Sequence, residues 1–284
     1  MRRWPAASGR DHYRPDVTFL PVPQPFDFAL TTERFRAFGP DRANLWHDGG
    51  LHRVVGGREL RIEAAPGGVE VEPLDAETEP VVRALLGLAF DLGAFSAWAA
   101  GDDVLAGLVS RLAGFRPTLT PDPFEMLVGA IVAQQVSLFS ARAIQNRLVE
   151  RFGERTGEAW AFPSRARIAA AHEDELFAVG FTRRKAEYAV GLARSELDLA
   201  ALAGLPDSEV KESLTALRGI GEWTADWFLA RHLARPHAWP WGDLVLRKAV
   251  ASLYRGLDVR EAGARFHPFE NLTAHHLLLA QRVP

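Results

Sequence analysis

Asp243 stands in a setting that suits chemistry, within the stretch WPWGDLVLRKAV. Pro240 and Gly242 interrupt the chain before it, and apolar residues at helical spacing follow it, so we expect Asp243 to open a helix. A helix N-terminus favours negative charge, and a carboxylate there could stabilise a positively charged reaction centre or accept a proton. Considered alone, the more ordinary interpretation is that Asp243 serves only as the N-cap of its helix.

A tight turn between two helices precedes this aspartate in the stretch LTALRGIGEWTADWFLA, residues 214–230. Glycines on both sides of Ile220 allow the turn to reach positive φ, with the Ile220 side chain tucked between the helices. The backbone N–H groups of Gly219, Gly221 and Thr224 would then point outward at a helix N-terminus, where an anion such as a DNA phosphate is favoured. An ordinary corner between two helices is the alternative interpretation.

The composition is that of an ordinary globular protein, with 48% hydrophobic and 24% charged residues. The net charge of -3 does not favour nucleic acid as a partner, but the charge is unevenly distributed. Residues 1–100 contain 11 Arg and 14 Asp or Glu, whereas residues 101–284 contain 22 basic and 22 acidic residues and are free to present a basic face. The sequence has no cysteine, which excludes disulfides, cysteine-bound zinc and iron–sulfur clusters.

Two regions of different periodicity follow one another, and together they predict an α+β protein. Residues 17–75 alternate apolar and polar residues around Gly-Gly and Pro-Gly-Gly turns. Strands are expected at 51–55, 59–65 and 68–74. From about residue 76 apolar residues recur at helical spacing, and no further strand is expected. We therefore expect a loosely ordered leader at 1–16, an N-terminal antiparallel β-sheet domain at 17–100 and an all-helical body at 101–284.

Helices in the second region are expected wherever apolar residues fall on one face. The expected helices are 79–91, 102–113, 122–135, 138–152, 164–171, 173–178, 183–194, 207–217, 222–234, 243–255, 259–265 and 269–281. N-caps are expected at Ser164, Thr182, Asp207 and Asp258. The two helices within residues 207–234 would form a helix-hairpin-helix, and the helix at 243–255 would carry Asp243.

The string L-x-G-I-G-x-W-T-A, followed by an aspartate at a matching separation, resembles the signature of the helix-hairpin-helix DNA glycosylase superfamily. Within it the chain is similar to the AlkA-type 3-methyladenine DNA glycosylases (type II), loosely over most of its length and well over residues 120–245. The resemblance implies an enzyme of base excision repair that flips an alkylated purine out of DNA and hydrolyses its N-glycosidic bond. It assigns Asp243 as the catalytic carboxylate, which stabilises the oxocarbenium-like sugar and orients or deprotonates water.

The same resemblance places an aromatic base pocket beside that carboxylate. Trp223 and Trp227 share one face of the second hairpin helix and would stack on a cationic base such as 3-methyladenine or 7-methylguanine. Packing in the core is the alternative for such a pair. Phe266 and Phe269 take the places of further pocket aromatics, although Glu270 stands where the family commonly has an arginine. Trp223 also occupies the position of the nucleophilic lysine of lyase-active members, so no lyase activity is expected.

Residues 123–153 resemble the same family in a helix, a Q-x-V-S junction and a second helix. The family's intercalating residue lies in this junction, and Gln135 takes its place, although many members have leucine there. Gln134 and Ser137 are expected to contact DNA nearby, with a helix N-cap as the alternative for Ser137.

Two further DNA-binding features follow from the resemblance. Basic side chains of GFTRRKAEYAVGLA would approach the phosphate backbone, with a solvated helical turn as the alternative; these are Arg183, Arg184 and Lys185. Hairpin carbonyls of this family hold a monovalent metal cation, Na⁺ or K⁺, and the matching carbonyls are those of Thr215, Leu217 and Ile220.

The expected partner is double-stranded DNA with alkylated bases, bound by a cytoplasmic monomer that requires no cofactor. No run of about 18 apolar residues indicates a membrane span. No spacing of His, Asp and Glu indicates a catalytic metal, and His275 and His276 are expected to be capping or core residues. Two alternatives remain, a glycosylase for deaminated or etheno purines and a non-catalytic helix-hairpin-helix DNA-binding protein.

Overall fold

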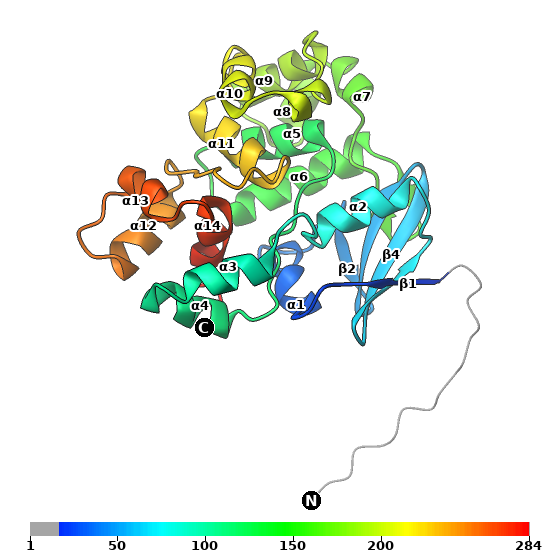
Figure 1. Cartoon of the computed structure of the whole chain (residues 1–284). Helices are drawn as coiled ribbons and strands as arrows, with labels where there is room; N and C mark the ends of the chain where they lie inside the picture. Colours follow the sequence, from blue (N-terminus) through cyan, green and yellow to red (C-terminus); the bar gives the residue numbers. More distant parts are fainter. Residues whose placement is uncertain (1–16, 284) are drawn as a thin grey trace, which may run out of the picture.

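The computed structural model describes residues 17–283, in which a five-stranded sheet stands beside a helical body (Figure 1). The expected leader, residues 1–16, lies outside the described residues. The strands are β1 (Thr18–Pro21), β2 (Leu45–His47), β3 (Gly50–Val55), β4 (Arg58–Ala65) and β5 (Gly68–Glu72). They are antiparallel in the order β1-β5-β4-β3-β2, which confirms the predicted fold class.

The sheet buries one face because its strands alternate apolar and polar residues. Leu60 and Ile62 of β4 are fully buried, and Val71 of β5 lies opposite Ile62 in the register. Helix α2 (Thr78–Leu85) covers this face with Val82 and Leu85 (Figure 1). The sheet therefore has its own small core, separate from the main core of the helical body.

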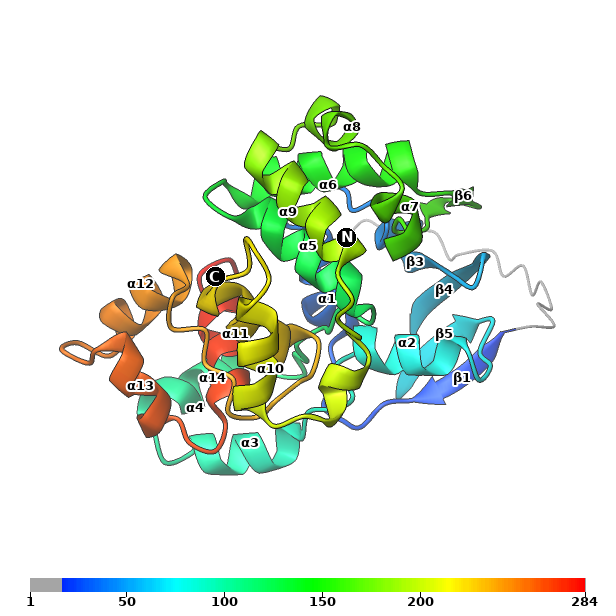
Figure 2. The ribbon, with the colours of Figure 1, turned by 90° about the horizontal axis from the view of Figure 1, so that it is seen from above.

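From α4 onward the helices of the body agree with the expected positions, except at some ends. Besides the short α1 (Phe28–Thr31), the helices of the body are α3 (Leu92–Ala99), α4 (Asp103–Arg111), α5 (Pro123–Ala133), α6 (Leu138–Phe152), α7 (Arg165–Ala169), α8 (Glu173–Ala178), α9 (Arg183–Arg194), α10 (Asp207–Thr215), α11 (Glu222–Arg231), α12 (Leu244–Leu253), α13 (Val259–Arg265) and α14 (Glu270–Leu279). Figure 2 shows α10, α11 and α14 grouped at the centre of the body, with the sheet to one side. In the described part of the chain no helix is long and apolar enough to cross a membrane.

Helix α3 and the strands β6 and β7 were not predicted, nor was the short helix α1. Helix α3 has the sequence LGAFSAWA, which is apolar on most sides and so lacks the one-sided pattern of a surface helix. Its Phe95 packs against Phe269 with ring centroids 5.6 Å apart. The expectation of no strand after residue 76 was also wrong, because β6 (Arg155–Thr156) and β7 (Ala159–Trp160) pair around Gly157, whose φ of 61° suits the tight turn.

The expected helix caps are confirmed at three of four positions. Ser164, Thr182 and Asp258 each accept a backbone N–H of the first turn of their helix. Asp207 is instead the first residue of α10, after Pro206 at the N-cap, and its carboxylate pairs with Arg235 at 3.2 Å. Proline is favoured at helix starts, so the boundary lies one residue earlier than the aspartate suggested.

Two adjacent histidines of α14, His275 and His276, are buried in the core, which was one of the two roles expected for them. His276 lies between Phe95 and Phe115, and its Nδ1 lies 2.8 Å from the Leu272 carbonyl oxygen. Burial lowers the pKa of His276 to about 4, and burial together with nearby arginines lowers the pKa of His275 further below its usual value. Both imidazoles are therefore neutral in the folded protein near neutral pH.

These histidines should make the protein lose stability in mildly acidic solution. Their pKa values are lower in the folded than in the unfolded chain, so the stabilisation is complete above pH 6.5 or so and declines as the pH falls toward about 4. Replacement of His276 by Leu should reduce the loss of unfolding free energy between about pH 7 and about pH 5.5 by about 1 kcal/mol. Urea unfolding at both pH values measures this change. If the variant lost as much unfolding free energy between them as the wild type does, the role given to His276 would be contradicted.

Candidate active site

Asp243 is the N-cap of α12, so the ordinary interpretation is correct for one of its oxygens. Oδ1 accepts the backbone N–H groups of Val245 at 2.9 Å and Leu246 at 3.1 Å. Oδ2 accepts no hydrogen bond from any residue between 17 and 283, and the residue is only half-buried. One oxygen therefore fixes the carboxylate on the helix, and the other remains available to a ligand.

Trp223 lies between the residue before Asp243 and a cavity. A Cβ on Gly242, the residue before Asp243, would lie 3.5 Å from Cδ1 of Trp223. The same indole lines the cavity, which extends between α5, α6, α11 and the segment that follows β1. Trp223 is half-buried, so its ring is a surface on which a flat ligand could stack next to Asp243.

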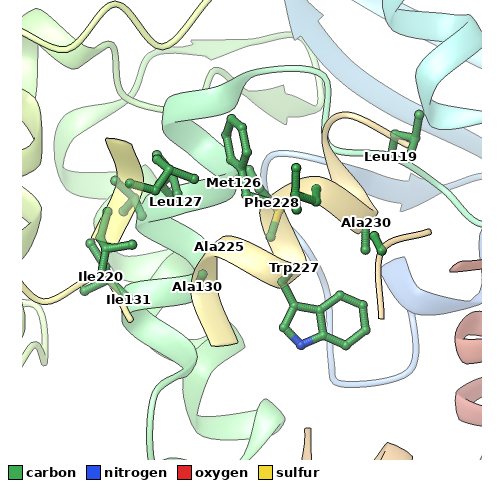
Figure 3. Close-up of a cluster of buried hydrophobic side chains, with 14 of the residues drawn as sticks. Leu119, Met126, Leu127, Ala130, Ile131, Ile220, Ala225, Trp227, Phe228 and Ala230 are labelled. Atoms are coloured by element: carbon green, nitrogen blue, oxygen red, sulfur yellow. The ribbon is translucent and has the colours of Figure 1, made fainter. Parts of the chain in front are cut away.

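Trp227 also lines the cavity but is only 3% exposed. Figure 3 shows it on α11 in the same cluster of buried side chains as Phe228. The guanidinium of Arg231 lies 3.9 Å from the centre of the Trp227 ring, and His275 contacts that ring edge-on at 5.8 Å. A face of Trp227 is therefore already covered, and of the two expected indoles Trp223 is the one that offers a free surface. Trp223 thus fits the stacking interpretation, and Trp227 fits the core interpretation.

Four arginines that sequence reasoning missed line the cavity. Arg142 and Arg282 form ion pairs with Asp41 and Glu33, and the other two are Arg34 and Arg231. Burial, and then Arg142, lowers the pKa of Arg34 to about 10, while burial and the charge of Arg34 lower the pKa of Arg231 well below its usual range. Asp243 opposes this shift of Arg231, so the two charges interact. Neither Arg34 nor Arg231 has a carboxylate within ion-pair distance among the described residues.

The two expected pocket phenylalanines lie elsewhere, because they pack in the core around α3 and α12. Phe266 is fully buried between Trp239 and Tyr254, with ring centroids 5.4 and 5.2 Å away. Phe269 packs against α3. Neither lines the cavity, whose remaining walls come from residues 30–44 and 115–121, far from the hairpin in the sequence.

The hairpin between α10 and α11 has the expected turn, with one difference. Gly219 has φ of 88°, and a Cβ there would lie 2.1 Å from the Tyr188 ring, whereas Gly221 is extended at φ −104° and ψ 178°. Ile220 is 5% exposed and sits in the main core, as predicted. Thr224 is fully buried, and its N–H bonds the Gly221 carbonyl at 3.0 Å, so it does not lie on the outer surface where a phosphate was expected.

The junction between α5 and α6 is tied to the hairpin by buried polar contacts. Gln134 donates from Nε2 to the Gly219 carbonyl at 2.9 Å, so it links junction and hairpin. Lys185 does not lie on the surface: its Nζ donates to the carbonyls of Val132 and Gln134 at 2.8 and 2.6 Å. An ammonium is favoured at the C-terminus of a helix, which explains why this lysine turns inward while its neighbours stay exposed.

Gln135 itself projects from this junction. It is exposed with φ of 55°, a conformation that costs a non-glycine residue about 1 kcal/mol. Next to it Leu138 and Phe139 are 45% and 64% exposed, and Leu138 also lines the cavity. Ser137 caps α6 by accepting the Ser140 N–H at 3.1 Å, which is the alternative stated for it.

The two exposed arginines of α9 lie on the same helix as Lys185 but at the surface. Arg183 pairs with Asp174 at 3.1 Å and lies over the Phe177 ring at 4.7 Å. Arg184 is exposed. Both arginines remain accessible to an anion such as a phosphate. Of the two, only Arg183 would have to release a carboxylate, that of Asp174, in order to bind it.

Replacement of Lys185 by Met should loosen the junction. The variant keeps the aliphatic stem but leaves two carbonyl groups without their donor, so we expect the free energy of unfolding to fall by about 1–3 kcal/mol. Amide hydrogen exchange should accelerate across residues 132–136. Arg184→Met is the matched control, because it removes an exposed charge from the same turn; equal exchange in the two variants would contradict this role for Lys185.

Comparison with known proteins shows which family this region resembles. Residues 128–263 match the model of the HhH-GPD superfamily base excision DNA repair proteins. This part of the chain is therefore similar to the HhH-GPD superfamily. The match includes the α5–α6 junction, the hairpin and Asp243, and it ends before α14.

Relatives extend the HhH-GPD similarity beyond this region. The DNA-3-methyladenine glycosylase of Bacillus subtilis is 33% identical over 171 residues, which are 57% of this chain and 56% of that protein. The DNA-3-methyladenine glycosylase 2 of Escherichia coli is 28% identical over 184 residues, 61% of this chain and 64% of that protein. The matches thus span about half to two thirds of these curated relatives. The solved structure of the 3-methyladenine DNA-glycosylase from Archaeoglobus fulgidus superimposes with a TM-score of 0.84 at 27% identity, over 93% of this chain and 98% of that one.

Proposed function

We propose that this protein is a DNA glycosylase of base excision repair that hydrolyses the N-glycosidic bond of alkylated purines. One observation carries the proposal: Gly242, the residue before Asp243, lies against the Trp223 indole that lines the cavity, and Oδ2 of Asp243 accepts no hydrogen bond from the described residues. The names of the relatives, which are 3-methyladenine glycosylases, support the substrate class. A DNA-binding module without activity would not require a cavity at this position.

Asp243 would act on the sugar of a flipped-out nucleotide. As the base leaves, positive charge develops on the deoxyribose, and the carboxylate can stabilise it and hold or deprotonate the attacking water. Trp223 would stack on the base, which aligns the glycosidic bond with the carboxylate. Since α12 already fixes Oδ1, the charge needs little reorganisation during the reaction.

The proposed enzyme would not cleave the DNA strand, because no lysine is placed for Schiff-base formation. Lys185 is engaged with α5, and Lys211 pairs with the buried Asp226 at 2.6 Å. Lys248 lies exposed on α12, after the turn that presents Asp243. Incubation with a borohydride reductant should therefore trap no covalent protein–DNA adduct.

DNA would be held by the hairpin and by the α5–α6 junction, with Gln135 filling the gap left by the flipped base. A monovalent cation would bind where α10 ends, because carbonyls beyond the last helical turn offer oxygen ligands, although the Leu217 carbonyl also accepts the Ile220 N–H at 3.1 Å. The carbonyls of Thr215, Leu217 and Ile220 would hold Na⁺ or K⁺, which adds positive charge beside a phosphate. We further propose a cytoplasmic monomer, testable by light scattering on the DNA-free protein.

A second candidate substrate class, neutral deaminated or etheno purines, is favoured by the arginines of the cavity. Arg34 and Arg231 bring positive charge to the place where a cationic base would stack. Guanidinium groups instead pair well with the carbonyl and ring-nitrogen acceptors of a neutral purine such as hypoxanthine. The proposed glycosidic chemistry is the same for both classes, and only the base contacts differ.

A base-release assay separates these functions. DNA carrying 3-methyladenine, 7-methylguanine, hypoxanthine or 1,N6-ethenoadenine is incubated with the protein, and the free base is measured by mass spectrometry. Release of the methylated purines supports the proposal, and preferential release of hypoxanthine or ethenoadenine supports the second candidate. Binding to DNA without release of any base would leave a non-catalytic DNA-binding protein.

A further inference from the structure

Three side chains with metal-binding atoms meet outside the proposed active site, around the start of α14. His237 comes from the loop between α11 and α12, and His267 and Glu270 flank the turn that leads into α14. One possible ligand atom from each lies within 4.8 Å of the others. None of these residues lines the cavity described above. Their separation in the sequence explains why no metal-binding pattern was visible there.

The carboxylate of Glu270 is the centre of this cluster. Oε2 lies 3.2 Å from Nδ1 of His237, and Oε1 lies 3.2 Å from Nδ1 of His267. The two imidazoles stack with ring centroids 4.8 Å apart and an interplanar angle of 16°. The Glu270 side chain is 9% exposed, whereas those of His237 and His267 are 51% and 64% exposed. A buried anion is thus covered by two imidazoles that solvent can reach.

The backbone on both sides of the cluster is held in place by Asn271. Its side chain donates to the carbonyls of Ala230 and Arg235 at 3.1 and 2.9 Å, and its N–H donates to the Pro236 carbonyl at 3.0 Å. Asn271 itself is fully buried. These bonds fix the loop of His237 against the first turn of α14, so a ligand need not order the backbone.

The charge of this cluster is not balanced by a basic side chain. No Lys or Arg lies within ion-pair distance of Glu270 in the described part of the chain, and the nearby Arg235 and Arg265 pair with Asp207 and Asp102. A nearly buried carboxylate requires a compensating positive charge. The N-terminus of α14, which begins at Glu270, supplies part of this charge, and a cation bound between Glu270 and the two imidazoles would supply more.

We propose that His237, His267 and Glu270 form a binding site for a divalent transition metal of the zinc class. Two imidazoles and one carboxylate are the ligand types that Zn²⁺ prefers, with water in the fourth position. Ligand distances of about 2.1 Å place tetrahedral ligand atoms about 3.4 Å apart. The two nitrogen–oxygen separations, one to each oxygen of Glu270, are close to this at 3.2 Å. The three ligand atoms as a set lie within 4.8 Å of one another, so the ion would draw the two imidazoles closer together. The ion would join the α11–α12 loop to α14 and would not take part in base release.

Calorimetric titration of the tag-free full chain with ZnCl₂ tests this site. We expect one Zn²⁺ per chain with a Kd in about the micromolar range, and Co²⁺ should give the visible absorption of a tetrahedral site. Zn²⁺ should also raise the Tm, whereas Mg²⁺ and Ca²⁺, which prefer oxygen ligands, should not. No saturable binding at a ratio of one would overturn the proposal.

Variants assign the binding to these residues. A His237→Ala, His267→Ala double variant should weaken Zn²⁺ binding at least about a hundredfold and abolish the Co²⁺ spectrum. Because both side chains are exposed, this variant should fold even if Glu270→Gln does not. His172→Asn is the matched control, since His172 is exposed and approaches a single carboxylate, that of Asp174, at 3.3 Å. Equal binding by the wild type and the double variant would place the metal elsewhere and overturn the assignment.

Discussion

Replacement of Asp243 by Asn is expected to lower the single-turnover rate of base release at least about a hundredfold while leaving DNA affinity nearly unchanged. Asparagine caps helices as well as aspartate does, so its side-chain oxygen can still accept the two N–H groups of α12. What the variant loses is the negative charge of the second oxygen. The loss should therefore appear in the chemical step, measured by rapid quench with enzyme in excess over DNA.

Asp258→Asn is the matched control for this variant. Asp258 caps α13 through the N–H of Arg260 at 2.8 Å and so makes the same structural contact as Asp243. Its replacement should leave the rate and the Tm close to those of the wild type. If Asp243→Asn retained full activity, Asp243 would be a cap and nothing more.

Replacement of Gly219 by Ala should have the largest effect on the hairpin. The residue has φ of 88°, and the added Cβ would overlap the Tyr188 ring at 2.1 Å. The backbone strain and the overlap together should lower the free energy of unfolding by about 2–4 kcal/mol. Because the turn must move, DNA affinity should also fall by about tenfold, provided that the hairpin binds phosphate.

Gly221→Ala is the matched control, because it shows whether the effect comes from the positive-φ turn at Gly219 or from the loss of any glycine in the hairpin. Gly221 is extended, and a Cβ there would meet no atom within 4 Å. This variant should lose at most about 1 kcal/mol, the usual difference between good and poor N-cap residues. Urea unfolding and fluorescence anisotropy with duplex DNA measure both quantities. Equal losses in the two variants would contradict the role given to the Gly219 turn.

The sequence predicted the elements that depend on local chemistry. The glycines around Ile220 predicted the hairpin turn, which the structure contains with Gly219 alone at positive φ. The break at Pro240 and Gly242 places Asp243 at a helix start, as expected. The alternating strands were visible because one face of the sheet is buried. Each of these signals is set by residues near one another in the chain.

Features that depend on distant contacts could not be predicted in this way. Arg34 reaches the cavity from the segment after β1, and no local pattern marks it as a neighbour of Trp227. Lys185 was assigned to the surface with its two arginine neighbours, because the carbonyls that it binds belong to α5. A phenylalanine at position 266 is compatible with either a pocket wall or the core. Its contacts with Trp239 and Tyr254, which only the structure shows, place it in the core.

The central claim is that Asp243 stabilises positive charge on the sugar, and binding of abasic-site analogues tests it without base release. Duplexes are compared that carry either a cationic pyrrolidine or a neutral tetrahydrofuran in place of the sugar. The wild-type protein should bind the cationic duplex at least about a hundredfold more tightly than the neutral one, and Asp243→Asn should lose that preference. Equal binding of both duplexes by the wild type, or an undiminished preference in the variant, would contradict the account.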